Sequence, residues 1–230
     1  MNTFIDSPEA PASHTAPAES ERITLTPQQF GVGARVTLAV MSDDYVSLIL
    51  GALGEADATG LQVTTGDVST FVGGAESDIL RYLSQLIGAV GRSGAHLNAV
   101  VHFSRGCPGE VLCERPATAG PVPGTVGERV LTGVPAVAEW ALYPLEDGVR
   151  GGAEPDHMRD IDAAIDFSKS NGTFRSSEHF VTRLEGDVAD VLHTVALGWI
   201  LVGRTVQHVT SHVTLSINSP FPNSPTGGTL

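Results

Sequence analysis

Histidine and small polar side chains are the residues of this sequence whose types and spacing suit chemistry. Of the eight histidines, His179 has the most informative neighbours, because it follows Glu178 in a short run of polar and apolar residues. An imidazole beside a carboxylate can serve as a general acid or base, or it can hydrogen-bond a ligand. It can equally be a histidine that is bonded locally within the fold, and the sequence leaves both interpretations open.

The motifs of familiar enzymes and metal sites are missing. The chain contains no G-x-S-x-G, no GxxxxGK[ST] and no H-E-x-x-H. His208 and His212 would be about 13 Å apart on one strand, at roughly 3.3 Å per residue, which is too far for a shared metal ion. Cys107 and Cys113 do not form a C-x-x-C motif. We therefore expect no catalytic residues, no metal and no cofactor, and an enzyme that uses His179 as acid and base is the less favoured alternative.

The composition restricts the partners. The chain carries 13 Lys and Arg against 26 Asp and Glu, so its formal net charge is −13. This balance argues against binding of nucleic acid or of an anionic membrane surface, which both need clustered basic residues. The apolar content of 41% is enough for a folded core, but no apolar run is long enough for membrane insertion. The N-terminus lacks a signal-peptide pattern, so we expect a cytoplasmic protein whose ligand, if charged, is a cation.

The elements that position these residues occur twice. When the chain is shifted by 112 positions, residues 44–108 align without a gap on residues 156–220, with 14 identities in 65 positions. Several of the identities are Gly or Pro at expected ends of helices and strands, where the backbone conformation is restricted. We interpret this match as an internal duplication.

Each copy is predicted to contain the same order of elements. In the second copy, we expect a strand over 137–143, a helix over 156–171, one or two strands within 173–184 and a second helix with an apolar stripe over 188–199. Residues 208–218 alternate between apolar and polar side chains, as a half-buried strand does. The order β-α-β-β-α-β is that of a ferredoxin-like unit, so we expect an α+β protein of two tandem ferredoxin-like domains with antiparallel sheets.

The remaining segments are rich in Pro, Gly, Ala and Ser and are predicted to flank or connect the two copies. The expected division is a flexible N-terminal arm over residues 1–33, a first repeat over 34–108, a linker over 109–136, a second repeat over 137–220 and a C-terminal tail over 221–230.

Small polar residues end the last strand of each copy. Ser104 and Ser216 take equivalent places, and Asn218 follows shortly after Ser216. Such groups can hydrogen-bond a heterocycle, or they can merely shape the turn, and both interpretations stay open.

A further set of short motifs follows in order along the two copies. The second copy has ALYPL at 141–145, GTF at 172–174, LEGDV at 184–188 and LSINSP at 215–220, and the first has MSDDY at 41–45, Ser69 with Thr70, and FSRGCPG at 103–109. In order, spacing and duplication, these segments resemble the YkoF-like thiamine/hydroxymethylpyrimidine-binding family over most of the folded chain.

This resemblance implies a structure and a role. It implies ACT-like (ferredoxin-like) domains, a homodimer, one ligand pocket per repeat, and non-catalytic binding of thiamine or its hydroxymethylpyrimidine precursor in uptake or salvage, with a thiamine-precursor transporter as a partner. The alternative is an ACT-like regulatory or assembly module that senses another small heterocycle. The polar side chains on the last strand favour ligand binding, since a pure assembly module would tend to be apolar there.

The two copies differ where the resemblance implies ligand contacts. The family has a Leu-Tyr-Pro strand end in both repeats, but here the second copy has Leu142–Pro144 and the first has Leu38–Val40. The family's middle-strand histidine is kept as His179, whereas the first copy has Asp67. We therefore expect the second pocket to retain more of the ligand-binding groups.

The resemblance and the chemistry of the residues together indicate a set of ligand contacts. Tyr143 can stack on a ring or attract a cation, and the carboxylate of Asp67 can pair with an amino group or a thiazolium. The full set is Tyr143, His179, Thr182, Ser216, Asn218, Asp67, Ser69, Thr70 and Ser104. The second copy also has extra residues that include Gly148–Gly152, which we expect to form either a flap over the site or a plain surface loop.

Overall fold

The computed structural model describes residues 25–107, 123–145, 157–204, 206 and 208–220. Most of the expected arm, the Gly148–Gly152 segment and the expected tail over 221–230 lie outside the described residues. Within the described part, no helix combines the length and the apolar character needed to cross a membrane.

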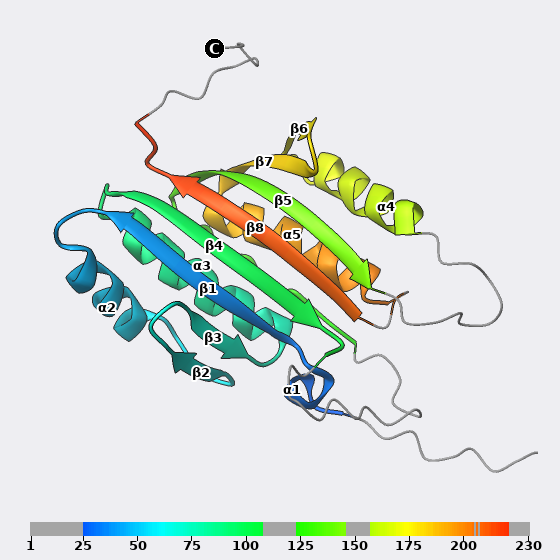
Figure 1. Ribbon diagram of the computed structural model, residues 1–230, viewed down its shortest axis with the longest axis horizontal. Coiled ribbons are helices and arrows are strands. Elements are labelled where there is room, and N and C mark those ends of the chain that lie inside the picture. Colours follow the sequence, from blue (N-terminus) through cyan, green and yellow to red (C-terminus); the bar gives the residue numbers. More distant parts are fainter. Residues whose placement is uncertain (1–24, 108–122, 146–156, 205, 207, 221–230) are drawn as a thin grey trace, which may run out of the picture.

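One order of elements occurs twice along the chain (Figure 1). The first copy consists of β1 (Gly33–Met41), α2 (Tyr45–Glu55), β2 (Gln62–Thr65), β3 (Thr70–Gly73), α3 (Glu76–Gly91) and β4 (His96–Arg105). The second copy consists of β5 (Pro135–Leu145), α4 (His157–Ser170), β6 (Phe174–Glu178), β7 (Val181–Asp187), α5 (Val188–Val202) and β8 (His208–Ile217). A short helix, α1 (Pro27–Phe30), precedes the first copy.

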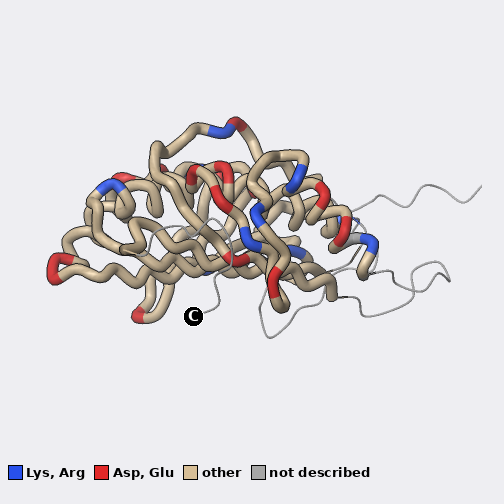
Figure 2. Tube along the Cα trace, turned by 90° about the horizontal axis from the view of Figure 1, so that it is seen from above, with Lys and Arg blue, Asp and Glu red and all other residues tan. Residues whose placement is uncertain are grey.

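The eight strands of the described residues form one sheet, in the order β2-β3-β1-β4-β8-β5-β7-β6. Every neighbouring pair is antiparallel. The prediction of two tandem ferredoxin-like units is confirmed, and the edge-to-edge pairing of β4 with β8 makes their sheets continuous. The helices gather on one face of the sheet, and the described chain leaves the other face open (Figures 1 and 2). Figure 2 also shows acidic and basic residues interspersed rather than segregated.

The strand register places the two copies in close correspondence, apart from an irregularity between Phe174 and Ser176 of β6. Val36 of β1 faces Thr70 and Val101, and Trp140 of β5 faces Thr182 and Val213. The strands that face β1 and β5 are thus related by the shift of 112 seen in the sequence. The first strands are related by a shift of 104 (140 − 36), because the second copy has extra residues before its first helix.

The hydrophobic core is shared by the two repeats. The largest fully buried side chain is that of Trp199 on α5, and its ring centroid lies 5.2 Å from that of Phe103 on β4. β8 alternates between buried and partly exposed residues along its whole length, as predicted. Burial of apolar surface at this contact stabilises both the fold of each repeat and the junction between them.

Asp187 ties the linker to the second repeat. Its carboxylate caps α5 by accepting from the Ala189 N–H, and it also accepts from the N–H and hydroxyl of Thr132 and from the Gly133 N–H. Burial raises the pKa of Asp187, but these four hydrogen bonds outweigh burial and leave the pKa below its ordinary value. The ionised carboxylate therefore stabilises the folded state.

The arm that was expected over residues 1–33 ends earlier than predicted, because its last residues are folded. Thr26 and Gln29 form a capping box that starts α1, and Phe30 at the end of this helix is buried. The guanidinium of Arg105 lies over the Phe30 ring, 5.2 Å from its centroid. The residues from Thr26 onward therefore belong to the folded unit, because the Phe30 side chain is part of the hydrophobic core. At the other boundary, β5 begins two residues before the expected start of the second repeat at residue 137.

Candidate functional site

A cleft in the second repeat combines aromatic and polar side chains. It lies between α4, the end of β5 and the β6–β7 hairpin, and its volume is about 250 Å³. Besides apolar residues of α4, the lining includes Trp140, Tyr143, Ser177, Glu178, Phe180 and Thr182. We call this hollow the repeat-two cleft. Of the predicted contacts, it brings together Tyr143 and Thr182.

Three aromatic residues line the repeat-two cleft. Trp140 is only 3% exposed, and its Nε1–H donates to Ser211 Oγ over 2.8 Å. Tyr143 and Phe180 are 51% and 97% exposed, respectively. Aromatic surface in water is unfavourable unless something covers it, so a flat ring is a suitable occupant.

Phe180 is held at the cleft by an uncommon backbone conformation. His179 and Phe180 form the two-residue turn between β6 and β7. Phe180 has a φ of 68°, a left-handed value that Gly or Asn normally adopts in such a turn. A bulky, exposed residue in a strained turn that lines a cleft is typical of a binding site.

His179 was predicted to lie within a strand, and this prediction is wrong. It is an exposed residue of the hairpin turn, with its ring 6.4 Å from that of Phe180, and it is not among the residues that line the cleft. Its neighbour Glu178 instead accepts from Ser176 Oγ over 3.0 Å and lies 3.6 Å from Arg183 Nη1. The prediction failed because a polar and apolar alternation can continue through a tight turn.

The hydroxyl of Thr182 distinguishes the second repeat from the first. Thr182 is buried on the strand beside Ser177. At the equivalent pair of the first repeat, the hydroxyls of Thr65 and Thr70 are hydrogen-bonded at 3.1 Å. Within the described part of the chain, Thr182 makes no side-chain hydrogen bond, so its hydroxyl is available to a ligand.

The first repeat has no aromatic side chains at the equivalent positions. The register relates Trp140, Tyr143, Phe180 and Glu178 to Val36, Ala39, Val68 and Gly66, respectively. The register also aligns Leu142–Pro144 with Leu38–Val40, as predicted from the sequence. The equivalent positions thus differ in the direction expected for the aromatic residues, which occur on the second repeat.

Ser104 and Ser216 lie away from the cleft, on the open face of the two central strands. Ser216 Oγ and His96 Nε2 are 3.4 Å apart, and Ser104 Oγ and His208 Nε2 are 3.3 Å apart. These two bonds are equivalent under the duplication, and each joins one repeat to the other. The structure therefore gives both serines a place at the junction.

The remaining predicted contacts are not brought to one place. Asn218 has a φ of 54° and donates from Nδ2 to the carbonyls of Gly91 and Ala95, so it closes the end of α3. Asp67 is exposed in the β2–β3 turn. Ser69 accepts a hydrogen bond from Arg35, and Thr70 is buried.

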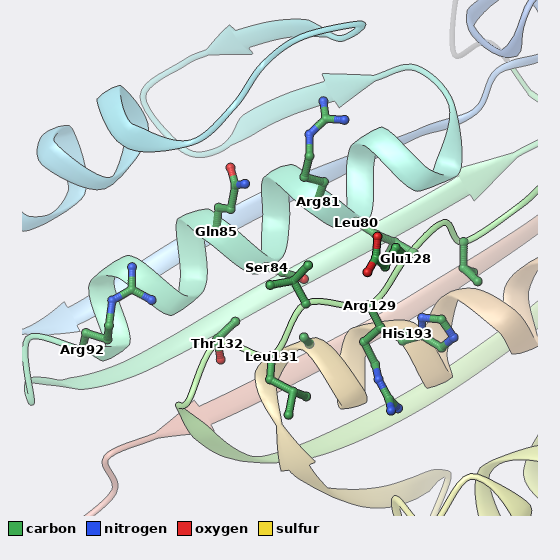
Figure 3. Close-up of a pocket in the computed structure, with 13 residues that line it drawn as sticks. Leu80, Arg81, Ser84, Gln85, Arg92, Glu128, Arg129, Leu131, Thr132 and His193 are labelled. Atoms are coloured by element: carbon green, nitrogen blue, oxygen red, sulfur yellow. The ribbon is translucent and has the colours of Figure 1, made fainter.

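A separate groove of about 310 Å³ lies in the helix layer, where the linker runs between α3 and α5 (Figure 3). Two of its guanidinium groups are already neutralised. Arg81 pairs with Asp57 and Asp78, and Arg129 pairs with Asp190. These cations are occupied in holding the linker and helices together, so the groove is not a strong candidate for a charged ligand.

Sequence reasoning missed two residues of the cleft. Trp140 was overlooked because a tryptophan on a strand is usually a core residue, and Phe180 because it follows the more conspicuous His179. A comparison of the two repeats could have found both, since each replaces a valine of the first repeat. Among the described residues, no three His, Cys, Asp or Glu side chains are grouped as metal ligands would be.

Comparisons with known proteins fit the duplicated architecture. The model of the YKOF-related family matches residues 31–110 and 136–222. The chain is also 31% identical, over 190 residues, to a protein of Bacillus subtilis (strain 168) that bears the name "Putative HMP/thiamine-binding protein YkoF". The aligned region covers 82% of this chain and 90% of that relative. Both repeats are included in these matches, and the chain belongs to the YKOF-related family.

Proposed function

We propose that the protein binds thiamine or its hydroxymethylpyrimidine precursor in the repeat-two cleft and releases it unchanged. The observation that carries this proposal is a set of features present only in the second repeat: two exposed aromatic residues and an unbonded hydroxyl at one cleft. The name of the Bacillus subtilis relative supports the class of ligand.

The chemistry of the cleft suits such a ligand. Tyr143 and Phe180 offer ring faces for an aminopyrimidine or a thiazolium. Thr182 can donate to a ring nitrogen. A cation over an aromatic face gains about 0.5–2 kcal/mol, which is enough to favour the cationic ligand.

Several features support binding without catalysis. A general acid–base pair needs its two groups within hydrogen-bond reach of each other and of the substrate. Glu178 is engaged by Ser176 and Arg183, and His179 lies outside the lining of the cleft. Incubation with thiamine followed by mass analysis tests this part of the proposal, and any conversion product would contradict it.

Homodimer formation, a role in uptake or salvage and a transporter partner remain predictions. Light scattering of the full chain tests the dimer, for which a monomer at micromolar concentration is the contrary result. Deletion of the gene in its native cell, with growth on limiting hydroxymethylpyrimidine as the readout, tests the role in salvage.

Calorimetric titration with thiamine and with hydroxymethylpyrimidine tests binding itself. Tyr143→Ala is expected to weaken thiamine binding by a factor of about 2–30, the equivalent of about 0.5–2 kcal/mol. Tyr45→Ala is the matched control, because Tyr45 is also 51% exposed but lies on α2 of the first repeat. Absence of heat with both ligands would refute the proposal, and equal effects of the two variants would refute the site.

A further inference from the structure

A second hollow lies on the open face of the sheet in the first repeat. It has a volume of about 390 Å³ and is bounded by the beginning of β1, the strands beside it and α1. The lining includes Gln28, Arg35, Gln62, Phe71, His102 and Ser104. We call it the repeat-one face pocket. It shares no lining residue with the repeat-two cleft.

The ring of Phe71 is seated on two glycines. A Cβ at Gly73 would lie 2.9 Å from Phe71 Cζ, and one at Gly33 would lie 3.1 Å from Phe71 Cε2. Gly33 and Gly73 are cross-strand partners, so their two missing side chains leave one gap on the sheet, and the ring fills it. The pocket therefore contains an aromatic platform whose position depends on these glycines.

Arg35 supplies a positive charge beside this platform. Its guanidinium carbon is 5.7 Å from the centroid of the Phe71 ring, and Nη1 donates to Ser69 Oγ over 3.1 Å. Within the described part of the chain, Arg35 makes no ion pair, and no Asp or Glu lines the pocket. A guanidinium has five N–H donors, so most of them are free for an anion. This is unusual in a chain with twice as many acidic as basic residues.

The other polar groups of the pocket are neutral. His102 is the cross-strand neighbour of Arg35. Burial, and after it the nearby His212, lowers the pKa of His102 and so favours its uncharged imidazole. Gln28 and Gln62 add amide donors and acceptors. Arg35 thus determines the charge that the pocket favours.

The residues that build this pocket are not repeated in the second repeat. Arg35, Phe71, Gly33 and Gly73 are replaced by Glu139, Arg183, Val137 and Glu185 at the equivalent register positions. Glu185 pairs there with Arg175 at 3.0 Å. The platform, the free charge and the glycines occur together only in the first repeat, which indicates a local purpose and not a general requirement of the fold.

We propose that the repeat-one face pocket binds a small planar ring that carries a phosphate or carboxylate group, with the ring against Phe71 and the anion on Arg35. Arg is well suited to such anions because its planar fork can donate two parallel hydrogen bonds to them. This site does not rest on the proposed function, since it lies in the other repeat and favours the opposite charge.

The test is an NMR titration of the full-length protein, in which the backbone amides of Gly33 and Gly73 report on the pocket. The probe is phenyl phosphate, with benzyl alcohol as the uncharged ring and inorganic phosphate as the anion without a ring. Phenyl phosphate is expected to shift both amides saturably, and to bind at least tenfold more tightly than either analogue. Thiamine, added separately, reports on the repeat-two cleft through Phe180 and Thr182.

Two variants make the test specific. Arg35→Gln, at an exposed position, should weaken phenyl phosphate binding at least tenfold, whereas Arg92→Gln should leave it unchanged as a matched exposed control. Gly73→Ala should also weaken binding, because its new methyl displaces the Phe71 ring. The proposal is overturned if phenyl phosphate gives no saturable shift at these amides, if inorganic phosphate binds equally well, or if Arg35→Gln behaves like Arg92→Gln.

Discussion

Replacing Glu76 by Gln removes one half of an ion pair that is buried where several segments meet. Glu76 begins α3 and Arg105 ends β4, and their side chains are 3% and 2% exposed. Phe30 of α1 covers the guanidinium. A Cβ at Gly124 of the linker would lie 2.7 Å from Glu76 Oε1, and one at Gly203 after α5 would lie 2.8 Å from Arg105 Cδ. These close approaches leave little room for water to replace the lost carboxylate charge.

The size of the effect follows from the charge that is left behind. Burial, and after it Arg204, lowers the pKa of Arg105 to about 10, so its guanidinium is still charged at neutral pH. Breaking a buried pair by removing one partner costs about 3–5 kcal/mol. For a chain of this size, 1 kcal/mol corresponds to about 2–4 °C in Tm. We therefore expect Glu76→Gln to lower Tm by about 6–20 °C.

Calorimetric melting of three variants, each compared with the wild type, distinguishes a buried unpaired charge from simple loss of contacts. Replacement of both partners by apolar residues, Glu76→Leu with Arg105→Met, should recover much of the stability, since no charge is then buried. Asp166→Asn is the control, because it breaks the exposed pair with Lys169 and should cost no more than about 1 kcal/mol. The reasoning is refuted if Glu76→Gln costs no more than Asp166→Asn, or if the double variant is less stable than the single one.

Three further predictions concern the linker, the repeat-two cleft and the equivalent positions of the first repeat. Asp187→Ala should lower the free energy of unfolding, measured with urea at pH 7, by about 2 kcal/mol. Because the folded-state pKa of Asp187 is lowered, this contribution is present above the ordinary value of 3.8 and is lost as the pH falls through the folded-state pKa. An undiminished difference from the wild type at pH 2 would contradict this reasoning. Phe180→Gly should raise the free energy of unfolding by about 1 kcal/mol through relief of the left-handed conformation and yet weaken thiamine binding in calorimetry, and a less stable variant would argue against strain. Ala39→Tyr combined with Val68→Phe should add a second thiamine-binding event, which an unchanged stoichiometry of one would disprove.

Much of the fold could be predicted because its signals are periodic. The alternation in residues 208–218 and the shift of 112 between copies depend on side-chain pattern alone, and both reappear in the strand register. The edge-to-edge pairing of β4 with β8 could not be predicted in the same way. Its hydrogen bonds are between backbone groups, which every sequence possesses, and no residue type marks them.

The candidate site was harder to predict because it depends on turns and on side chains far apart in sequence. His179 was assigned to a strand, since the residue type that marks a tight turn, Gly or Asn, is absent there and Phe180 takes the left-handed position. Asn218 was chosen for its amide, which the structure uses to close α3. The repeat-one face pocket depends on Gly33 and Gly73, whose role is visible only when β1 and β3 are paired.

The near-symmetry of the β4–β8 junction bears on how equivalent positions of the two repeats came to differ. Val101 and Val213 face each other there, and the histidine and serine bonds on either side are related as the two copies are. An assembly of two identical single-repeat chains with this geometry would carry identical pockets, so every mutation would alter both at once. Fusion of the copies into one gene removes that coupling. In a fused chain, the first repeat can keep valines where the second has aromatic residues, which a homodimer of one repeat cannot do.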